Sequence, residues 1–276
     1  MRRFLQGLDR PVYKFSVVGL GLIIVSAVIG SVYTPYDPLA LSIDTRLEPP
    51  SWAHWMGTDH FGRDLLSRLL VGAGVSLRVS LATVTLALTL GVLLGTAAGY
   101  FRGITDRVIS GVVDSLLAMP GILLALALIA VVGASEYGVI IALGLAYTPN
   151  VTRVVRGNVL SLRETNYVET AKLFGHPHWF IILRHIIPNV VGPLTVLASA
   201  YFAQALLSES VLSFLGLGVP PPHPSWGGIL AESRQFMTDA PWISIFPGLM
   251  IVLSLLFINL TGDALRDHFD PRMRKA

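Results

Sequence analysis

The sequence predicts an all-α integral membrane protein, a bundle of six transmembrane helices. Its 276 residues are 53% hydrophobic and only 13% charged, whereas soluble globular domains contain roughly 25% charged residues. A membrane core about 30 Å thick needs about 20 apolar helical residues. Six runs without charged side chains approach or exceed this length, namely residues 15–33, 79–101, 115–135, 137–152, 186–208 and 240–262.

The first run resembles a cleavable signal peptide because basic residues precede it. It is longer than the ~7–15-residue apolar region of such peptides and has no evident A-x-A cleavage site, so we expect it to remain as an anchor. The fourth run is short for a span and nearly adjoins the third, which indicates a tight hairpin. Pro120 is expected to kink the third span.

The distribution of Lys and Arg predicts which ends of the helices face the cytoplasm, because short cytoplasmic loops are enriched in these cations. With the N-terminus inside, only Arg46, Arg63, Arg68, Arg78 and Arg234 of the 20 lie outside. The opposite orientation would reverse this bias. We therefore expect both termini in the cytoplasm, and the net charge of +3 then reflects topology and not nucleic-acid binding.

Three polar segments connect the spans of a single transmembrane domain, residues 1–276. The first, residues 34–78, is periplasmic and opens with prolines that favour an extended chain. Its later part has the pattern of an amphipathic helix on the membrane surface, with Asp64 and Arg68 spaced for an i,i+4 pair. Segment 153–185 is cytoplasmic, and segment 214–239, which contains a proline-rich run, is periplasmic.

Signatures of nucleotide and metal chemistry are missing from the sequence. It has no G-x-x-x-x-G-K-[ST] phosphate loop, so any ATP that drives this protein must bind to another subunit. The absence of cysteine excludes disulfides and thiolate metal sites. His176, His178 and His185 share the cytoplasmic segment, but sequence proximity does not supply the convergent ligands of a metal site. We expect neither a cofactor nor catalytic residues in this chain.

Residues 164–175 predict a short helix within the cytoplasmic segment. Its start is polar and of a capping type, and Gly175 stands where a helix would terminate. Tyr167, Ala171 and Phe174 recur at helical spacing and predict a small apolar face. Periodicity alone does not decide whether this face packs on the protein's own helices or contacts a partner.

This segment resembles the EAA loop of ABC importer permeases. Glu169-Thr170-Ala171 is followed by Gly175 after three residues, and Pro188 stands thirteen positions beyond that glycine. Thr170 replaces the alanine that is usual at the second position. The resemblance implies that all five residues belong to a coupling loop, whose helix seats in a groove of a cytoplasmic ATPase subunit.

Further motifs make the chain similar to the C-type subunit of the peptide, oligopeptide and nickel permease group. The resemblance implies a bacterial inner-membrane permease that forms half of a path for short peptides by alternating access. The implied partners are a second, B-type permease, two ATPase subunits that bind ATP and Mg, and an extracytoplasmic solute-binding protein. Nickel or another small solute is the alternative, and an ion-coupled secondary transporter is disfavoured because no internal repeat is visible. The motifs are YDP at 36–38, GTDHFGRDLLSRLL at 57–70, LSFLGLG at 212–218, SWGGIL at 225–230 and NLTGDALRDHFDPR at 259–272.

Two ionisable residues lie within the predicted spans or at their ends, where charges are costly and often functional. Asp114 begins the third span near the cytoplasm, and Glu209 lies toward the outer end of the fifth. Both are candidates for the translocation path. The alternative for Glu209 is a hydrogen bond to the backbone or to a neighbouring helix. Because the two lie toward opposite membrane faces, they do not form the convergent set that an intramembrane enzyme would need.

Overall fold

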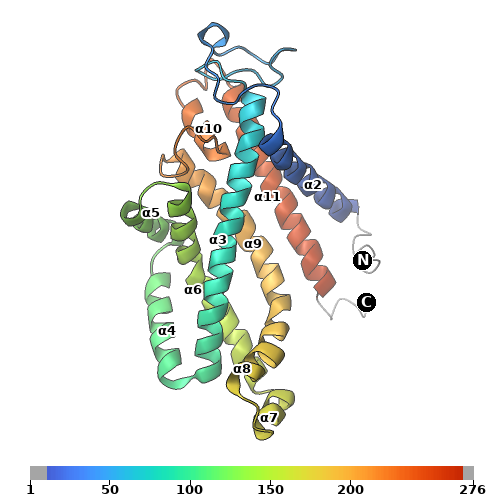
Figure 1. Ribbon diagram of the computed structural model, residues 1–276, viewed down its shortest axis with the longest axis vertical. Helices are drawn as coiled ribbons and strands as arrows, with labels where there is room; N and C mark the ends of the chain where they lie inside the picture. Colours follow the sequence, from blue (N-terminus) through green and yellow to red (C-terminus); the bar gives the residue numbers. More distant parts are fainter. Residues whose placement is uncertain (1–10, 270–276) are drawn as a thin grey trace.

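The computed structural model describes residues 11–269, with side chains to residue 267, and the regular elements of that range are all helical. Figure 1 shows them as an elongated bundle. Six cations counted above, Arg2, Arg3, Arg10, Arg272, Arg274 and Lys275, lie outside the described residues, as does the end of the last motif. The elements are α2 Pro11–Val32, η1 Ile43–Thr45, α3 Leu65–Phe101, α4 Gly103–Leu117, α5 Gly121–Val132, α6 Glu136–Arg163, α7 Asn166–Leu173, α8 His178–Ile181, η2 Ile182–Ile186, α9 Ile187–Phe214, α10 Trp226–Ser233 and α11 Trp242–Phe269.

Five helices of the described chain are long and apolar enough to cross a membrane. They are α2, α3, α6, the continuous stretch His178–Phe214 formed by α8, η2 and α9, and α11. Each overlaps one of the six predicted runs. A sixth crossing exists only if α4 and α5 together count as one span.

The third predicted span, residues 115–135, is not one straight helix. α4 ends at Leu117, and α5 begins at Gly121 with its axis bent by 96°. Pro120 lacks an N–H group and disfavours helical geometry at the residue before it. The proline therefore breaks the helix, a larger effect than the expected kink. The expected tight hairpin is present, since only residues 133–135 separate α5 from α6.

The prediction of an amphipathic surface helix in segment 34–78 is wrong. The second half of that segment forms the first turns of α3, which runs for 37 residues, or about 55 Å. Asp64 caps this helix by accepting from the backbone N–H of Ser67 at 2.8 Å. Its side chain does not pair with Arg68, whose guanidinium binds Asp59 and Glu232.

Small residues bring α3 and α6 into close contact along the centre of the bundle. Gly91, Gly95 and Gly99 recur every four residues, so they lie on one face of α3. A Cβ atom at any of them would come within 3 Å of Val151, Val155 or Val159 of α6. Glycine at these positions permits the close helix packing that is typical of membrane bundles.

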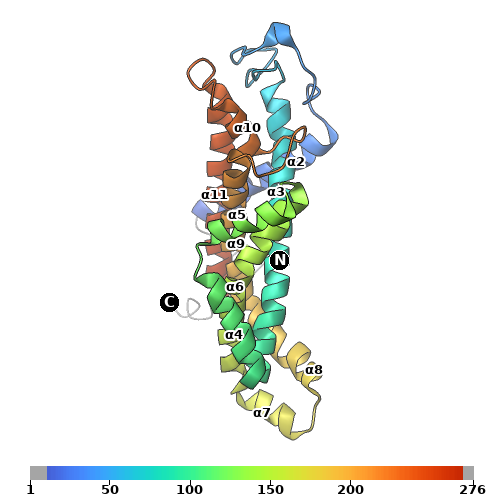
Figure 2. The ribbon, with the colours of Figure 1, turned by 90° about the vertical axis from the view of Figure 1, so that its left-hand side faces the viewer.

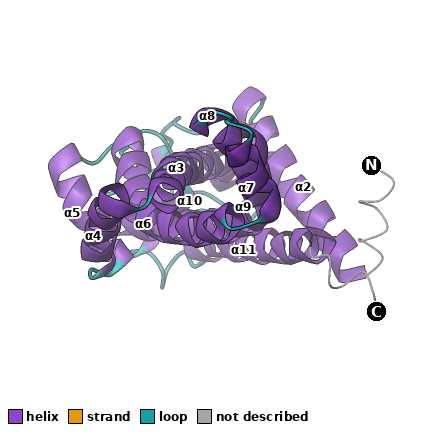
Figure 3. Ribbon diagram, turned by 90° about the horizontal axis from the view of Figure 1, so that it is seen from below, coloured by secondary structure: helices purple, strands orange, loops and turns teal. Residues whose placement is uncertain are grey.

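The two ends of the long axis carry different structures. Figure 2 shows segment 34–64 and α10 at one end, and α7 with α8 at the other. Seen from the α7 end, α2 and the α4–α5 pair lie on opposite sides of the bundle (Figure 3). The start of α2 meets the end of α11, because the Tyr13 hydroxyl donates to Asp267 at 2.7 Å.

Candidate functional site

The short helix α7 lies between α6 and α8 at one end of the bundle (Figure 2). Its buried side chains are Val168 and Ala171, which belong to one apolar cluster with Val159 of α6 and Ile181 of α8. The predicted apolar face is therefore wrong in part. Ala171 faces the protein's own helices, which is one of the two partners considered for this face. The other buried residue of α7 is Val168, whereas Tyr167 and Phe174 are exposed.

The end of α7 has the geometry that the sequence predicts. Gly175 has a φ of +76°, in the left-handed region that favours glycine. The N–H of His176 donates to the carbonyl of Ala171 at 3.2 Å, and the N–H of Gly175 donates to Lys172 at 2.9 Å. These two bonds form a Schellman motif. At the other end, Thr165 donates its hydroxyl to Leu162 and makes no side-chain cap, so the start of α7 lacks the expected cap.

The face of α7 that points away from the bundle is exposed and partly apolar. Leu173 and Phe174 are both largely exposed, and Glu169 and Thr170 are exposed beside them. Large apolar side chains gathered at one exposed end commonly mark a contact surface. Lys172 lies close by, and burial, together with the neighbouring Arg163 and Arg102, lowers its pKa.

Pro188 does not lie in α7 but in the first turn of α9. It has no N–H to donate to the carbonyl of Arg184, so it interrupts the regular bonding pattern at that point. The turn before it is a π-helix, in which the N–H of Ile187 donates to Ile182. Pro188 thus shapes the way the chain enters α9 from the α7–α8 end.

The two candidate path residues are not brought together. Asp114 is exposed on α4 and accepts from Arg153 of α6 at 2.6 Å. Both residues line a small polar cavity of about 160 Å³ between these helices, with Ser110 and Thr152.

Glu209 is fully buried in α9. It accepts from the Ser213 hydroxyl at 2.8 Å and from the Ser210 hydroxyl at 3.5 Å, both in its own helix. Ser76 of α3, whose hydroxyl accepts from the backbone N–H of Trp226 at 3.3 Å, and Ser225 before α10 lie near its carboxyl group. In this conformation Glu209 is therefore enclosed by α3, α9 and α10 and bonded to protein hydroxyls.

Sequence reasoning missed a group of charged residues at the end of the bundle opposite α7 (Figure 2). Arg63 and Arg68 both bind Asp59 and Glu232, with Arg68 buried between the two carboxylates. Ligand atoms of Asp59, His60 and Glu232 also lie within 4.8 Å of one another. Two guanidinium groups already neutralise these two carboxylates, so the cluster does not fit a metal site. The motif at 57–70 indicated that the region matters, but nothing local to it points to Glu232 in α10.

The sequence from residue 91 to residue 275 matches the family described as the binding-protein-dependent transport system inner membrane component. The chain belongs to this family. The protein is therefore a multi-pass permease of the inner membrane, a non-catalytic membrane subunit of an ABC transport system. Relatives that are permease proteins of peptide, dipeptide and glutathione transport systems confirm the predicted subunit class.

The relatives of this permease carry names from peptide and glutathione transport. A protein of Brucella suis biovar 1 (strain 1330), whose name assigns it provisionally to a peptide transport system, is 46% identical over 96% of this chain and 89% of its own. The dipeptide transport system permease protein DppC of Alkalihalophilus pseudofirmus is 42% identical over 95% and 87%. The glutathione transport system permease protein GsiD of Pectobacterium atrosepticum is 42% identical over 87% and 80%.

The fold of the permease is also found in a solved structure. The methionine ABC transporter MetNI in an inward-facing conformation aligns with a TM-score of 0.59, over 75% of this chain and 96% of that one. Only 17% of the aligned residues are identical. This likeness therefore establishes the shared arrangement of helices and nothing about the solute.

Proposed function

We propose that this permease forms one half of a translocation path for short peptides and moves them inward by alternating access. The support is the group of relatives, 42–46% identical, whose names refer to peptides, dipeptides and glutathione. These solutes are all short and contain amide linkages. The test is uptake by the complete transporter in proteoliposomes. Accumulation of a labelled dipeptide is expected, whereas accumulation of Ni²⁺ and of no peptide would contradict the proposal.

We infer four kinds of partner for the permease. They are a B-type permease, a pair of ATPase subunits that bind ATP and Mg²⁺, an extracytoplasmic solute-binding protein and the membrane lipid. Because the chain has no phosphate loop, purified permease alone should hydrolyse no ATP above background. Hydrolysis should appear when the ATPase subunits and the partner permease are added. Robust hydrolysis by this chain alone would contradict the assignment.

The proposed orientation places α7 and both termini in the cytoplasm, because the cations are concentrated on that side. A reporter that works only outside the cytoplasm should be active when fused near Leu47 or Pro222. The same reporter should be inactive near Arg102 or Gly175. Activity at Gly175 would invert the topology and remove α7 from the ATPase side.

We further propose that α7 is the coupling helix, and the burial of its side chains indicates which of them contact the ATPase subunit. The exposed Leu173 and Phe174 would contact the ATPase subunit, whereas Ala171 would hold α7 on the bundle through its contacts with α6 and α8. Movement of the ATPase subunit would then reach the spans through this packed cluster. The exposed residues of the EAA segment, Glu169 and Thr170, would lie at the same contact.

The test compares two exposed aromatic side chains, one at the start of α6 and one beyond its end. Phe174 is 79% exposed at the end of α7, and Tyr137 is 77% exposed at the start of α6. Phe174→Ser should reduce retention of the ATPase subunit and transport at normal permease abundance, and Tyr137→Ser should change neither. Equal retention in both variants would show that α7 only covers the bundle.

A further inference from the structure

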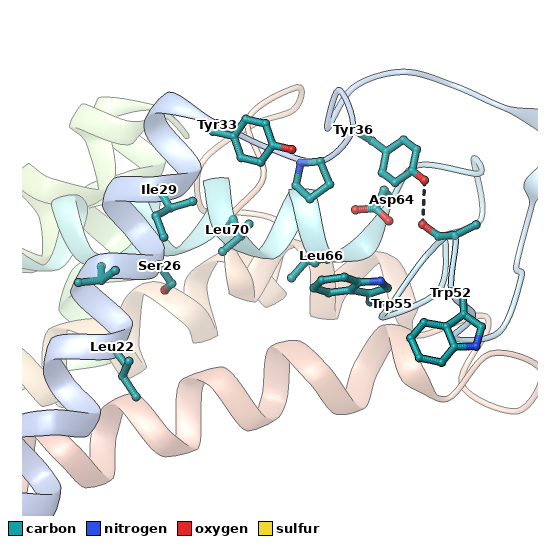
Figure 4. Close-up of a pocket in the computed structure, with 13 residues that line it drawn as sticks. Leu22, Ser26, Ile29, Tyr33, Tyr36, Trp52, Trp55, Asp64, Leu66 and Leu70 are labelled. Atoms are coloured by element: carbon teal, nitrogen blue, oxygen red, sulfur yellow. Dashed lines mark hydrogen bonds between the residues drawn. The ribbon is translucent and has the colours of Figure 1, made fainter.

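An apolar groove lies between α2, the first turns of α3 and the outer segment 34–64. Its volume is about 620 Å³, within the ~300–1,000 Å³ typical of ligand pockets. Figure 4 shows Leu22 and Ile29 of α2, with Tyr33 just after it, along one wall, and Leu66 and Leu70 of α3 along the other. Residues 52–55 of the outer segment lie at its outer end.

Three of the polar groups of the groove are already bonded within the protein. The hydroxyl of Ser26 donates to the carbonyl of Ile23 at 2.7 Å, and that of Tyr36 donates to Ala53 at 2.8 Å. The carboxylate of Asp64 is occupied by His54 and by Ser67. Among the described side chains, no Lys or Arg lines the groove. The Tyr33 hydroxyl and the indole N–H groups of Trp52 and Trp55 remain at its outer end, and the rest of its free surface is hydrocarbon and aromatic carbon, with no cation to hold a phosphate or a carboxylate.

The length and position of the groove correspond to one leaflet of a membrane. Along α2 it extends from Leu22 to Tyr33, about 16 Å at 1.5 Å per residue. Half of a bilayer core is about 15 Å. The surrounding stretch 15–36 has no charged residue. Tyr33, Tyr36 and two tryptophans stand at its outer end, where aromatic side chains typically mark the boundary between membrane and water.

From these features we propose that the groove binds one acyl chain of a phospholipid of the outer leaflet. The acyl chain lies between α2 and α3, and the head group lies among the aromatic side chains. Burial of the acyl chain in the groove, and not charge, fixes the position of the head group. A spanning helix of a partner subunit is the competing occupant. Such a helix has to continue beyond the membrane surface, where Trp52, Ala53 and Trp55 line the outer end of the groove.

Two valines of α2 provide a matched pair of variants. Val25 lines the groove and is 52% exposed, whereas Val28 is 59% exposed on the same helix and does not line it. In Val25→Trp the indole would fill the groove, and in Val28→Trp it would face bulk lipid. Both positions are exposed, so neither change disturbs the packed core, and assembly of the complete transporter in mild detergent verifies this.

The measurement is native mass spectrometry of the assembled transporter after extraction from membranes of phosphatidylethanolamine and phosphatidylglycerol. The original protein and Val28→Trp should retain one phospholipid per copy of this chain that Val25→Trp loses. A photoactivatable phospholipid, with its reactive group in the acyl chain, should label the peptides that contain residues 22–36 and 52–70, and Val25→Trp should lower that labelling at least tenfold.

Three outcomes would overturn the proposal. Equal lipid retention and labelling in the two tryptophan variants would show that only bulk lipid touches α2. A photoreactive amino acid placed at Ser26 that cross-links to the partner permease, and not to lipid, would identify a protein helix as the occupant. Loss of assembly in Val25→Trp but not in Val28→Trp would point to the same subunit contact.

Discussion

Replacement of Arg68 by Met should weaken the attachment of segment 34–64 to the bundle. Arg68 is 2% exposed. Its guanidinium donates to Asp59 and to both oxygens of Glu232, at 2.8 and 3.0 Å. Removal of one partner from a buried ion pair costs about 3–5 kcal/mol. Since Arg63 still binds Asp59 at 2.7 Å, we expect the lower value, about 3 kcal/mol, or roughly 150-fold in the opening equilibrium of the segment.

Arg63→Met is the matched control. Arg63 is 11% exposed and binds the same two carboxylates, but its loss leaves Arg68 in place with both of them. The expected cost is that of charge-assisted hydrogen bonds to groups that keep another partner, about 1.5 kcal/mol. The two variants should therefore differ by about tenfold in the opening equilibrium.

The pH dependence follows from the pKa of Asp59. Burial alone would raise this pKa, but Arg68 and Arg63 outweigh burial and hold it below the ordinary value of 3.8. The lowered pKa stabilises the folded segment above about pH 3.8, and this contribution is lost as the pH falls from there through the folded-state pKa. Without Arg68, burial is opposed less, so the folded-state pKa moves back toward 3.8 and the acid-dependent loss of stability should become smaller.

The assay is proteolysis of segment 34–64 in reconstituted permease, followed across pH together with tryptophan fluorescence. Trp242 reports on this segment because its indole N–H donates to the carbonyl of Thr58 at 3.2 Å. Faster cleavage in Arg68→Met than in Arg63→Met, at unchanged helix content, is expected. If Arg63→Met opens the segment as much, or if the acid-dependent loss of protection is as large in Arg68→Met as in the original protein, the buried ion pair is not what holds the segment.

Three other substitutions test the remaining sites. Gly175→Val should strain the left-handed turn after α7 by about 1–2 kcal/mol and weaken retention of the ATPase subunit. Asn tolerates this geometry better, so Gly175→Asn should retain more of the ATPase subunit. Equal retention in the two variants would refute the argument from the turn. Glu209→Ala should cost about 1–3 kcal/mol, because it leaves buried hydroxyls without their acceptor, and Glu209→Gln should cost less in thermal unfolding. Asp114→Asn should change stability by about 0–1 kcal/mol, because its pair with Arg153 is exposed. A loss of transport at unchanged melting temperature would support a role for Asp114 in the path. Full transport would exclude that role.

Sequence alone determined the positions of the five long spanning helices, because the need to bury a helical backbone in hydrocarbon acts on each run of residues separately. It also determined two changes of chain direction. Gly175 permits a backbone conformation that other residues resist, and Pro120 removes a helical hydrogen bond whatever surrounds it. The severity of the second effect, a 96° break, was underestimated.

Only the tertiary structure decided which way the functional side chains face. The first turns of α3 are mostly leucine, and the buried Arg68 among them meets Glu232, 164 residues away. Ala171 lies inward because α6 and α8 cover one side of α7, and Glu209 lies near Ser76 and Ser225, which are far from it in the sequence. Helical periodicity groups residues onto a face, but the partner of that face is chosen by contacts between distant segments.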